Sequence, residues 1–152
     1  MTTGDLLGIA IQHEVKSQIL YTHLATVVAA DEVKNVFLEL VLEERAHERR
    51  LYELSASGRF DLTLPIDAPE FSNEISRSHS VYVTIDENAS ATDVVDLAVG
   101  REKRAQQLFH RLASFSGEGP IRALFLQLAA EEEEHERRIL EKFAPLQKGN
   151  PD

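Results

Sequence analysis

The chain contains no cysteine, and its only methionine is Met1. Without cysteine it cannot form a disulfide, a thiolate metal site or an iron–sulfur cluster. Any bound metal would therefore be held by Glu, Asp or His. The sequence also lacks an apolar run of transmembrane length, and its N-terminus has no basic region before an apolar stretch. We therefore expect a soluble cytoplasmic protein.

Basic side chains are in the minority, because 16 Lys and Arg stand against 26 Asp and Glu and give a formal net charge of −10. This balance disfavours binding to nucleic acid or to anionic membranes. An acidic surplus usually reflects a solvated surface, but cations held inside the protein would also neutralise part of it. At 152 residues, 43% of them hydrophobic, the chain can bury a core of its own. We expect a single domain over residues 1–152.

Apolar residues recur at steps of three and four over most of the chain, which is typical of amphipathic helices. We predict an all-α fold with helices over about residues 5–30, 31–56, 91–116 and 120–144. Asp31 is the predicted N-cap of the second helix, and Ser90 with Asp93 is the predicted capping box of the third. Gly58 and Pro145 mark the predicted ends of the second and fourth helices.

The helical periodicity is lost between residues 57 and 90. This stretch contains Pro65, Pro69 and a short β-like run, Val81–Thr84. A connection of this length is unusual inside a compact domain and indicates a lid, a crossover or a disordered linker. We favour a crossover, because a capped helix follows it.

The two halves of the chain repeat each other. A shift of 88 residues aligns Asp5–Leu54 with Asp93–Lys142 without a gap, with seventeen identities in fifty positions. This similarity predicts a duplicated helical hairpin. The matches include carboxylates and histidines on the apolar stripes, where an ordinary core would exclude them. These residues are Glu14, Glu44 and His47 in the first half and Glu102, Glu132 and His135 in the second.

The spacing of these residues indicates a metal site. A Glu followed three positions later by a His places both side chains on one helical face, and each half has one such pair. In a four-helix bundle the two pairs would meet at the axis with Glu14 and Glu102. Four buried carboxylates would repel one another and take raised pKa values unless cations are present. One Glu from each of two helices, with Glu-x-x-His from the other two, is the ligand set of di-iron and di-manganese bundles.

We therefore predict Glu14, Glu44, His47, Glu102, Glu132 and His135 as ligands of two iron ions. The ligand types suit manganese as well, and they leave zinc or cobalt open. Taken alone, the charged run from Glu131 to Glu136 is equally typical of a solvated helix face. The metal site is favoured because all six positions fall on apolar stripes and recur at equal spacing. The other carboxylates of the run are expected in solvent or around the ligands: Glu131, Glu133, Glu134 and Glu136.

Tyr21 lies two turns beyond Glu14, where its hydroxyl could hydrogen-bond a ligand carboxylate or act as a nearby redox group. A plain core aromatic is the alternative. Its mate in the repeat is Phe109, which keeps the ring and loses the hydroxyl. Gln18 and Gln106, one turn beyond the single Glu ligands, would line an access route or a polar boundary. Four histidines without mates are expected at the surface: His13, His23, His79 and His110.

These motifs resemble the rubrerythrin-like branch of the ferritin-like superfamily. The resemblance rests on Ala10–Glu14 with Tyr21, on Phe37–His47, and on Glu102 and Phe109 with Glu132 and His135. It implies a ferritin-like four-helix bundle of two pseudo-symmetric hairpins with a long crossover. It also implies a di-iron centre that reacts with hydrogen peroxide or dioxygen. Glu44 and Glu132 would bridge or chelate the metals, Glu14 and Glu102 would be terminal, and each histidine would bind one metal.

The chain departs from that family at two points. Rubrerythrins carry a cysteine-ligated rubredoxin domain, so a chain without cysteine would need an external electron donor protein. They also tend to have an extra glutamate one turn after the third-helix ligand, where this chain has Ala105. The site would then be more symmetric, as in bacterioferritins, although the haem-binding methionine of bacterioferritins is missing.

The resulting hypothesis is a homodimeric di-iron redox protein. It would oxidise ferrous iron with peroxide or dioxygen, or reduce hydrogen peroxide with an external donor. One alternative is a ferroxidase or iron-storage bundle within a larger assembly. Another is a bundle that binds metal without catalysis.

Overall fold

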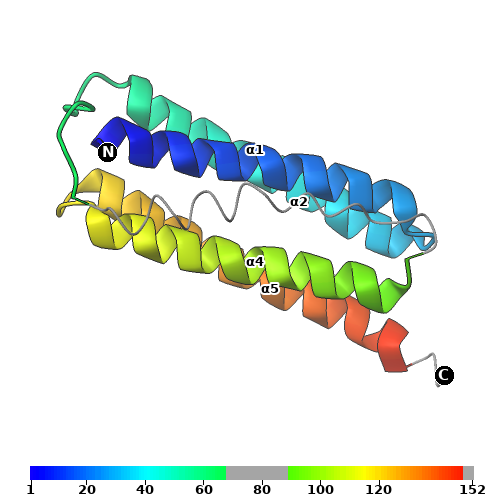
Figure 1. The fold of residues 1–152 in the computed structure, drawn as a ribbon. Helices are drawn as coiled ribbons and strands as arrows, with labels where there is room; N and C mark the ends of the chain where they lie inside the picture. The colour runs from blue at the N-terminus through cyan, green and yellow to red at the C-terminus, as the bar shows by residue number, and fades with distance from the viewer. Residues whose placement is uncertain (68–88, 149–152) are drawn as a thin grey trace.

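The computed structural model describes residues 1–67 and 89–148, with side chains up to Ala144. Its helices are α1 (Thr3–Val27), α2 (Asp31–Ala56), α4 (Ala91–Phe115) and α5 (Pro120–Lys148), and the described residues form no strand. In Figure 1, α1 pairs with α2 and α4 pairs with α5, and the two hairpins pack lengthwise as a four-helix bundle. The all-α prediction is confirmed. No helix in this described part of the chain has the length and apolarity needed to cross a membrane.

The connection between the hairpins joins opposite ends of the bundle. Figure 1 shows that α2 ends at the same end of the bundle as the turn between α4 and α5, whereas α4 begins at the other end. The described ends of the connection between the hairpins therefore lie at opposite ends of the bundle, as the predicted crossover requires. The β-like run Val81–Thr84 lies outside the described residues.

The helix ends agree with the sequence in part. The capping box of Ser90 and Asp93 is confirmed, and Thr2 with Asp5 forms a second capping box that opens α1. The prediction that Asp31 is an N-cap was wrong, because Ala30 is the N-cap and Asp31 is the first helical residue. A carboxylate in the first turn is still favourable there, since it interacts with the positive end of the helix dipole.

The predicted end of the last helix was also wrong. The helix α5 continues to Lys148 and does not stop before Pro145. A proline removes one backbone N–H but leaves the residues after it free to adopt helical dihedral angles. At the end of α2 the prediction holds, because Gly58 follows the C-cap Ser57 with a φ of 73° that favours glycine.

Two apolar clusters fill the bundle, one on each side of a polar layer. One cluster is built around Leu6, Leu51 and Phe125, and the other around Leu24, Phe37 and Phe143. The buried polar side chains that belong to neither cluster are His13, Glu14, Ser17, Glu44, His47, Glu102, Glu132 and His135. The core is therefore interrupted by acidic and imidazole groups, and these groups make the candidate site.

Candidate metal centre

The structure brings the six predicted ligand residues together. Each is buried, with an exposed fraction of at most 3%. Because their positions fall on the inner stripe of every helix, they reach the axis from all four sides of the bundle. Glu14 comes from α1, Glu44 and His47 from α2, Glu102 from α4, and Glu132 and His135 from α5.

Two overlapping groups of four residues together contain all six side chains. In each group, one ligand atom per residue lies within 4.8 Å of the others. The first group contains Glu14, Glu44, His47 and Glu132, and the second contains Glu44, Glu102, Glu132 and His135. Glu44 and Glu132 belong to both groups. This is the arrangement in which two carboxylates can serve two cations at once.

The two halves of the site are arranged alike. Nδ1 of His47 lies 2.9 Å from Oε1 of Glu132, and Nδ1 of His135 lies 2.8 Å from Oε1 of Glu44. The two imidazole rings are stacked at 5° with their centroids 5.5 Å apart. Each histidine thus points Nδ1 at the shared carboxylate of the other hairpin, so Nδ1 is the atom placed to bind a metal.

Buried polar atoms without hydrogen-bond partners test whether these residues fit a metal. Both oxygens of Glu14 and of Glu44, one oxygen each of Glu102 and Glu132, and Nδ1 of both histidines are buried and make no hydrogen bond of suitable geometry, although each Nδ1 lies close to a carboxylate oxygen. Leaving one such atom unsatisfied costs about 1–3 kcal/mol. So many unsatisfied atoms facing one point would be unstable unless a ligand meets them. Oxygen and imidazole donors suit divalent iron, manganese or zinc, so the residues fit a metal pair.

The electrostatics of the six groups agree with that fit. Burial is the main cause that raises the pKa of Glu14, Glu44 and Glu132, and it raises that of Glu102 to about 8. Burial disfavours a charged imidazole, but contacts with Glu102 and Glu44 raise the pKa of His135 to about 11. Without metal, the cluster therefore retains protons that a cation would displace.

A second layer of charged groups surrounds the histidines. Nε2 of His47 lies 3.8 Å from Glu131, and Nε2 of His135 lies 3.5 Å from Glu43. Arg50 donates to both oxygens of Glu131 at 3.2 and 2.9 Å, and Arg138 holds Glu43 at 2.5 and 3.1 Å. Each histidine therefore faces a carboxylate of the opposite hairpin through Nε2.

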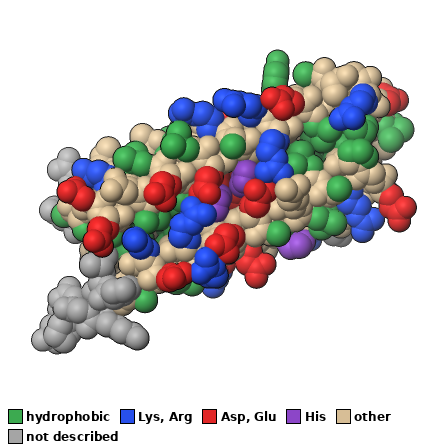
Figure 2. Space-filling view, turned by 180° about the vertical axis from the view of Figure 1, so that it is seen from behind, with side chains coloured by type: hydrophobic (Ala, Val, Ile, Leu, Met, Phe, Trp, Pro, Cys, Tyr) green, Lys and Arg blue, Asp and Glu red, His purple; other side chains and the backbone are tan. Residues whose placement is uncertain are grey.

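The outer layer reaches the surface between α2 and α5. Figure 2 shows histidine side chains at the middle of this face, between acidic and basic ones. Glu43 and Glu131 are 38% and 40% exposed, so they connect the buried imidazoles with solvent. The expectation that some of the acidic run surrounds the predicted ligand residues is met by Glu131, which lies beside His47. Glu133 and Glu134 are exposed.

Tyr21 contacts one of the clustered carboxylates. The side chain is fully buried, and its hydroxyl donates a hydrogen bond to Oε1 of Glu102 on the other hairpin. Burial, followed by the nearby carboxylates, raises the pKa of the phenol well above its usual range. Tyr21 therefore stays protonated and acts as a donor.

The two glutamines are bound symmetrically. Gln18 donates to Glu48 and Gln106 donates to Glu136, each at 2.8 Å. Each also donates to the backbone carbonyl of the Glu one turn earlier, Glu14 or Glu102, at 3.2 Å. They therefore form a polar boundary between the helices of each hairpin.

One predicted surface histidine is buried. His13 has an exposed fraction of 6% and meets the ring of Phe109 edge-on at 5.8 Å, so that prediction was wrong. Its position one residue before Glu14 turns it toward α4. His23 and His110 are exposed as predicted, and His79 lies outside the described residues. The sequence reasoning also missed Arg101, which donates to Ser17 and to the carbonyl of His13.

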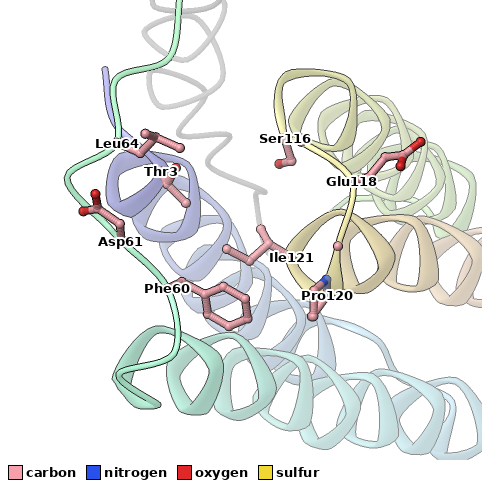
Figure 3. Close-up of a pocket in the computed structure, with 10 residues that line it drawn as sticks. Thr3, Phe60, Asp61, Leu64, Ser116, Glu118, Pro120 and Ile121 are labelled. Atoms are coloured by element: carbon pink, nitrogen blue, oxygen red, sulfur yellow. The ribbon is translucent and has the colours of Figure 1, made fainter.

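A pocket of about 190 Å³ lies at the end of the bundle where α1 and α5 begin (Figure 3). Phe60, Leu64, Pro120 and Ile121 give it a largely apolar wall. None of the six clustered residues lines it. The pocket is therefore separate from the candidate metal centre.

The fold and the cluster define a class of protein, the carboxylate-rich four-helix bundles. The family model described as Rubrerythrin matches residues 5–144, so the chain belongs to the rubrerythrin family. No curated protein matches the chain.

Two solved structures share this fold. A structure from Thermotoga maritima, described as "a putative ferritin-like diiron-carboxylate protein", has a TM-score of 0.71 and 22% identity, covering 93% of each chain. A hypothetical protein from Pyrococcus furiosus has a TM-score of 0.70 and 20% identity, covering 100% of this chain and 94% of that one.

Proposed function

We propose that this rubrerythrin-family protein is a di-iron oxidoreductase. It oxidises ferrous iron with hydrogen peroxide or dioxygen, or reduces hydrogen peroxide with electrons from an external donor protein. The observation that carries the proposal is the pair of overlapping buried groups that share Glu44 and Glu132. A site for a single structural ion would not require two shared carboxylates and two symmetric histidines.

The residues assigned to the metals follow from the two groups. Glu14 and His47 would hold one iron ion, Glu102 and His135 would hold the other, and Glu44 and Glu132 would serve both. A pair of ferrous ions supplies two electrons, which is the number needed to reduce hydrogen peroxide with two protons to two molecules of water.

The protein itself contributes orientation and exclusion of water. The hydrogen bond from Tyr21 fixes Glu102, and the apolar clusters on both sides keep bulk solvent from the polar layer. Interactions between charges are stronger in such a dry site than in water. Glu43 and Glu131, which touch both solvent and the imidazoles, are the groups placed to pass protons inward.

The test uses metal-free protein loaded under anaerobic conditions with two equivalents of ferrous iron and then mixed with hydrogen peroxide. We expect loss of one equivalent of peroxide per iron pair, with oxidation of the bound iron. Continued turnover with excess ferrous iron would identify a ferroxidase, and turnover only with an added reductant would identify a peroxidase. Loaded protein that leaves peroxide, dioxygen and ferrous iron unchanged would instead support the non-catalytic alternative.

We also propose that the protein acts as a homodimer. The support is that two large apolar side chains one turn apart on α2, Leu38 and Leu42, are 45% and 62% exposed. Light scattering gives the solution mass. A mass of two chains supports this proposal, whereas a mass of many chains favours the assembly alternative.

A further inference from the structure

Arg101 cross-links the two helices that each contribute a single carboxylate to the site. It directly precedes Glu102 on α4, and its side chain crosses to α1. Its Nε donates to Oγ of Ser17 at 3.0 Å, and its Nη2 donates to the carbonyl oxygen of His13 at 2.9 Å. Both lengths are those of ordinary hydrogen bonds.

The two acceptors lie on either side of Glu14. His13 precedes it by one residue, and Ser17 follows it by three, so Arg101 hydrogen-bonds to both ends of the helical turn that carries the carboxylate. Ser17 and His13 are 1% and 6% exposed, so water cannot easily replace Arg101 at either of them. The turn of α4 that carries Glu102 is thereby joined to the turn of α1 that carries Glu14.

The hydrogen bonds of Arg101 lie between α1 and α4, where the two halves of the repeat differ in sequence. Between α2 and α5 the residues around the histidines are identical in both halves: Glu43 and Glu131, Glu44 and Glu132, His47 and His135, and Arg50 and Arg138. Between α1 and α4 the mates differ at three successive turns. His13 corresponds to Arg101, Ser17 to Ala105, and Tyr21 to Phe109. The hydrogen bonds that Arg101 and Tyr21 make between α1 and α4 therefore have no counterpart at the equivalent positions of the other half.

We propose that Arg101 is a positioning residue for the metal centre, which holds Glu14 at a fixed distance from Glu102 so that the Glu14 group can bind its metal. This inference rests on the proposed metal centre. It goes further because it assigns a role to a residue that is not itself a ligand. It also predicts that the two metal positions depend differently on that residue. Loss of Arg101 should weaken the position that uses Glu14 and His47 more than the one that uses Glu102 and His135.

If Arg101 acted mainly through its charge, its removal would change the metal affinity in the opposite direction. A guanidinium near the site repels cations, so its removal would strengthen metal binding if charge were its main effect. Arg101→Gln removes the charge and the two-point link, whereas Arg101→Lys keeps the charge and loses the planar pair of donors. The two variants therefore distinguish positioning from charge.

The experiment titrates metal-free protein with Co²⁺ in competition with a chelating indicator, which gives the affinity of each bound ion. The visible absorption of protein-bound Co²⁺ is recorded in the same titration. Wild-type protein should bind two Co²⁺ per chain. Both Arg101 variants should bind one Co²⁺ with nearly wild-type affinity and the other about 10-fold or more weakly, the usual effect of losing a residue that orients a ligand. Ser17→Ala, which removes one of the two hydrogen bonds, should give a smaller loss at the same position.

Arg137→Gln is the matched control, because Arg137 pairs with Glu134 and Glu141 on the exposed side of α5. It should titrate like the wild type. Circular dichroism of each variant confirms that it is folded, and Ser17→Ala provides the test if an Arg101 variant does not fold.

Three outcomes would overturn the inference. Tighter binding by Arg101→Gln with unchanged binding by Arg101→Lys would show that Arg101 acts through its charge. Unchanged affinities with a lower melting temperature would show that it only stabilises the fold. Wild-type protein that binds no Co²⁺ would contradict the metal centre itself, and this result is distinct from a failure of the variants alone.

Discussion

Tyr21 on α1 donates a hydrogen bond to Glu102 on α4, whereas the residue at the equivalent place in the other half, Phe109, has no hydroxyl to offer Glu14. Glu102 therefore has one oxygen held by the protein, while both oxygens of Glu14 lack a hydrogen bond. The two halves of the site have the same carboxylate and histidine residues but differ in the hydrogen bonds that hold Glu14 and Glu102.

Replacing Tyr21 by Phe should destabilise the metal-free protein. The change removes a buried donor and leaves Oε1 of Glu102 without its partner, which should lower the free energy of unfolding by about 1–3 kcal/mol. Urea denaturation measures the effect. Tyr52→Phe is the control, because Tyr52 is 63% exposed and its change should stay within about 0.5 kcal/mol. Equal effects of the two substitutions would contradict the buried contact.

The stability of the metal-free protein should decrease as the pH rises from about 5 to 8. Burial and the neighbouring Glu132 raise the pKa of Glu102 from 4.5 to about 8, so between these values the folded chain holds a proton that the unfolded chain has lost. Each such proton lowers the free energy of unfolding by up to about 1.4 kcal/mol per pH unit. The raised pKa of His135 acts in the same direction above its usual value of 6.5.

Urea denaturation in the presence of a chelator, at several pH values, measures this trend. Metal-loaded protein is the comparison, and its stability should instead increase with pH, because fewer protons compete for the ligands. A metal-free protein that becomes more stable from pH 5 to 8 would contradict the raised carboxyl pKa values.

Replacing Glu43 and Glu131 by Gln should weaken metal binding although neither is assigned as a ligand. These carboxylates face Nε2 of His135 and His47, and a carboxylate at that nitrogen orients the imidazole and keeps Nδ1 free for the metal. The affinity should fall about 10-fold or more in a competition assay with a chelator. Glu133→Gln, an exposed change on α5, should leave it unaltered. No loss in the double variant would mean that the outer carboxylates do not support the histidines.

The four helices and the six clustered residues could be predicted from the sequence because their patterns occur in both halves of the repeat. A carboxylate or histidine that recurs on an apolar stripe after 88 residues, as Glu14 and Glu102 do, has no ordinary place in a core. Arg101 and the buried His13 were not foreseen because they lie where the halves differ. An arginine one residue from an inner position can turn to solvent or inward, and only the packing of α1 on α4 decides between them.

The ends of the helices were also predicted less well from the sequence than the helices themselves. Local preference alone predicts helix boundaries at Asp31 and Pro145, yet the N-cap of α2 is Ala30, whose side chain makes no capping hydrogen bond, and α5 continues past the proline. Tertiary packing of a long amphipathic helix contributes more than one capping group or one lost backbone hydrogen bond.

The central claim is that two metal ions share Glu44 and Glu132, and metal analysis of anaerobically purified protein tests it most directly. The account predicts two metal ions per wild-type chain. It predicts about one per chain in Glu14→Gln, because that carboxylate belongs to one group only, and essentially none in the double variant Glu44→Gln, Glu132→Gln. A double variant that still carries two metal ions per chain, with Glu133→Gln as the control, would contradict the account.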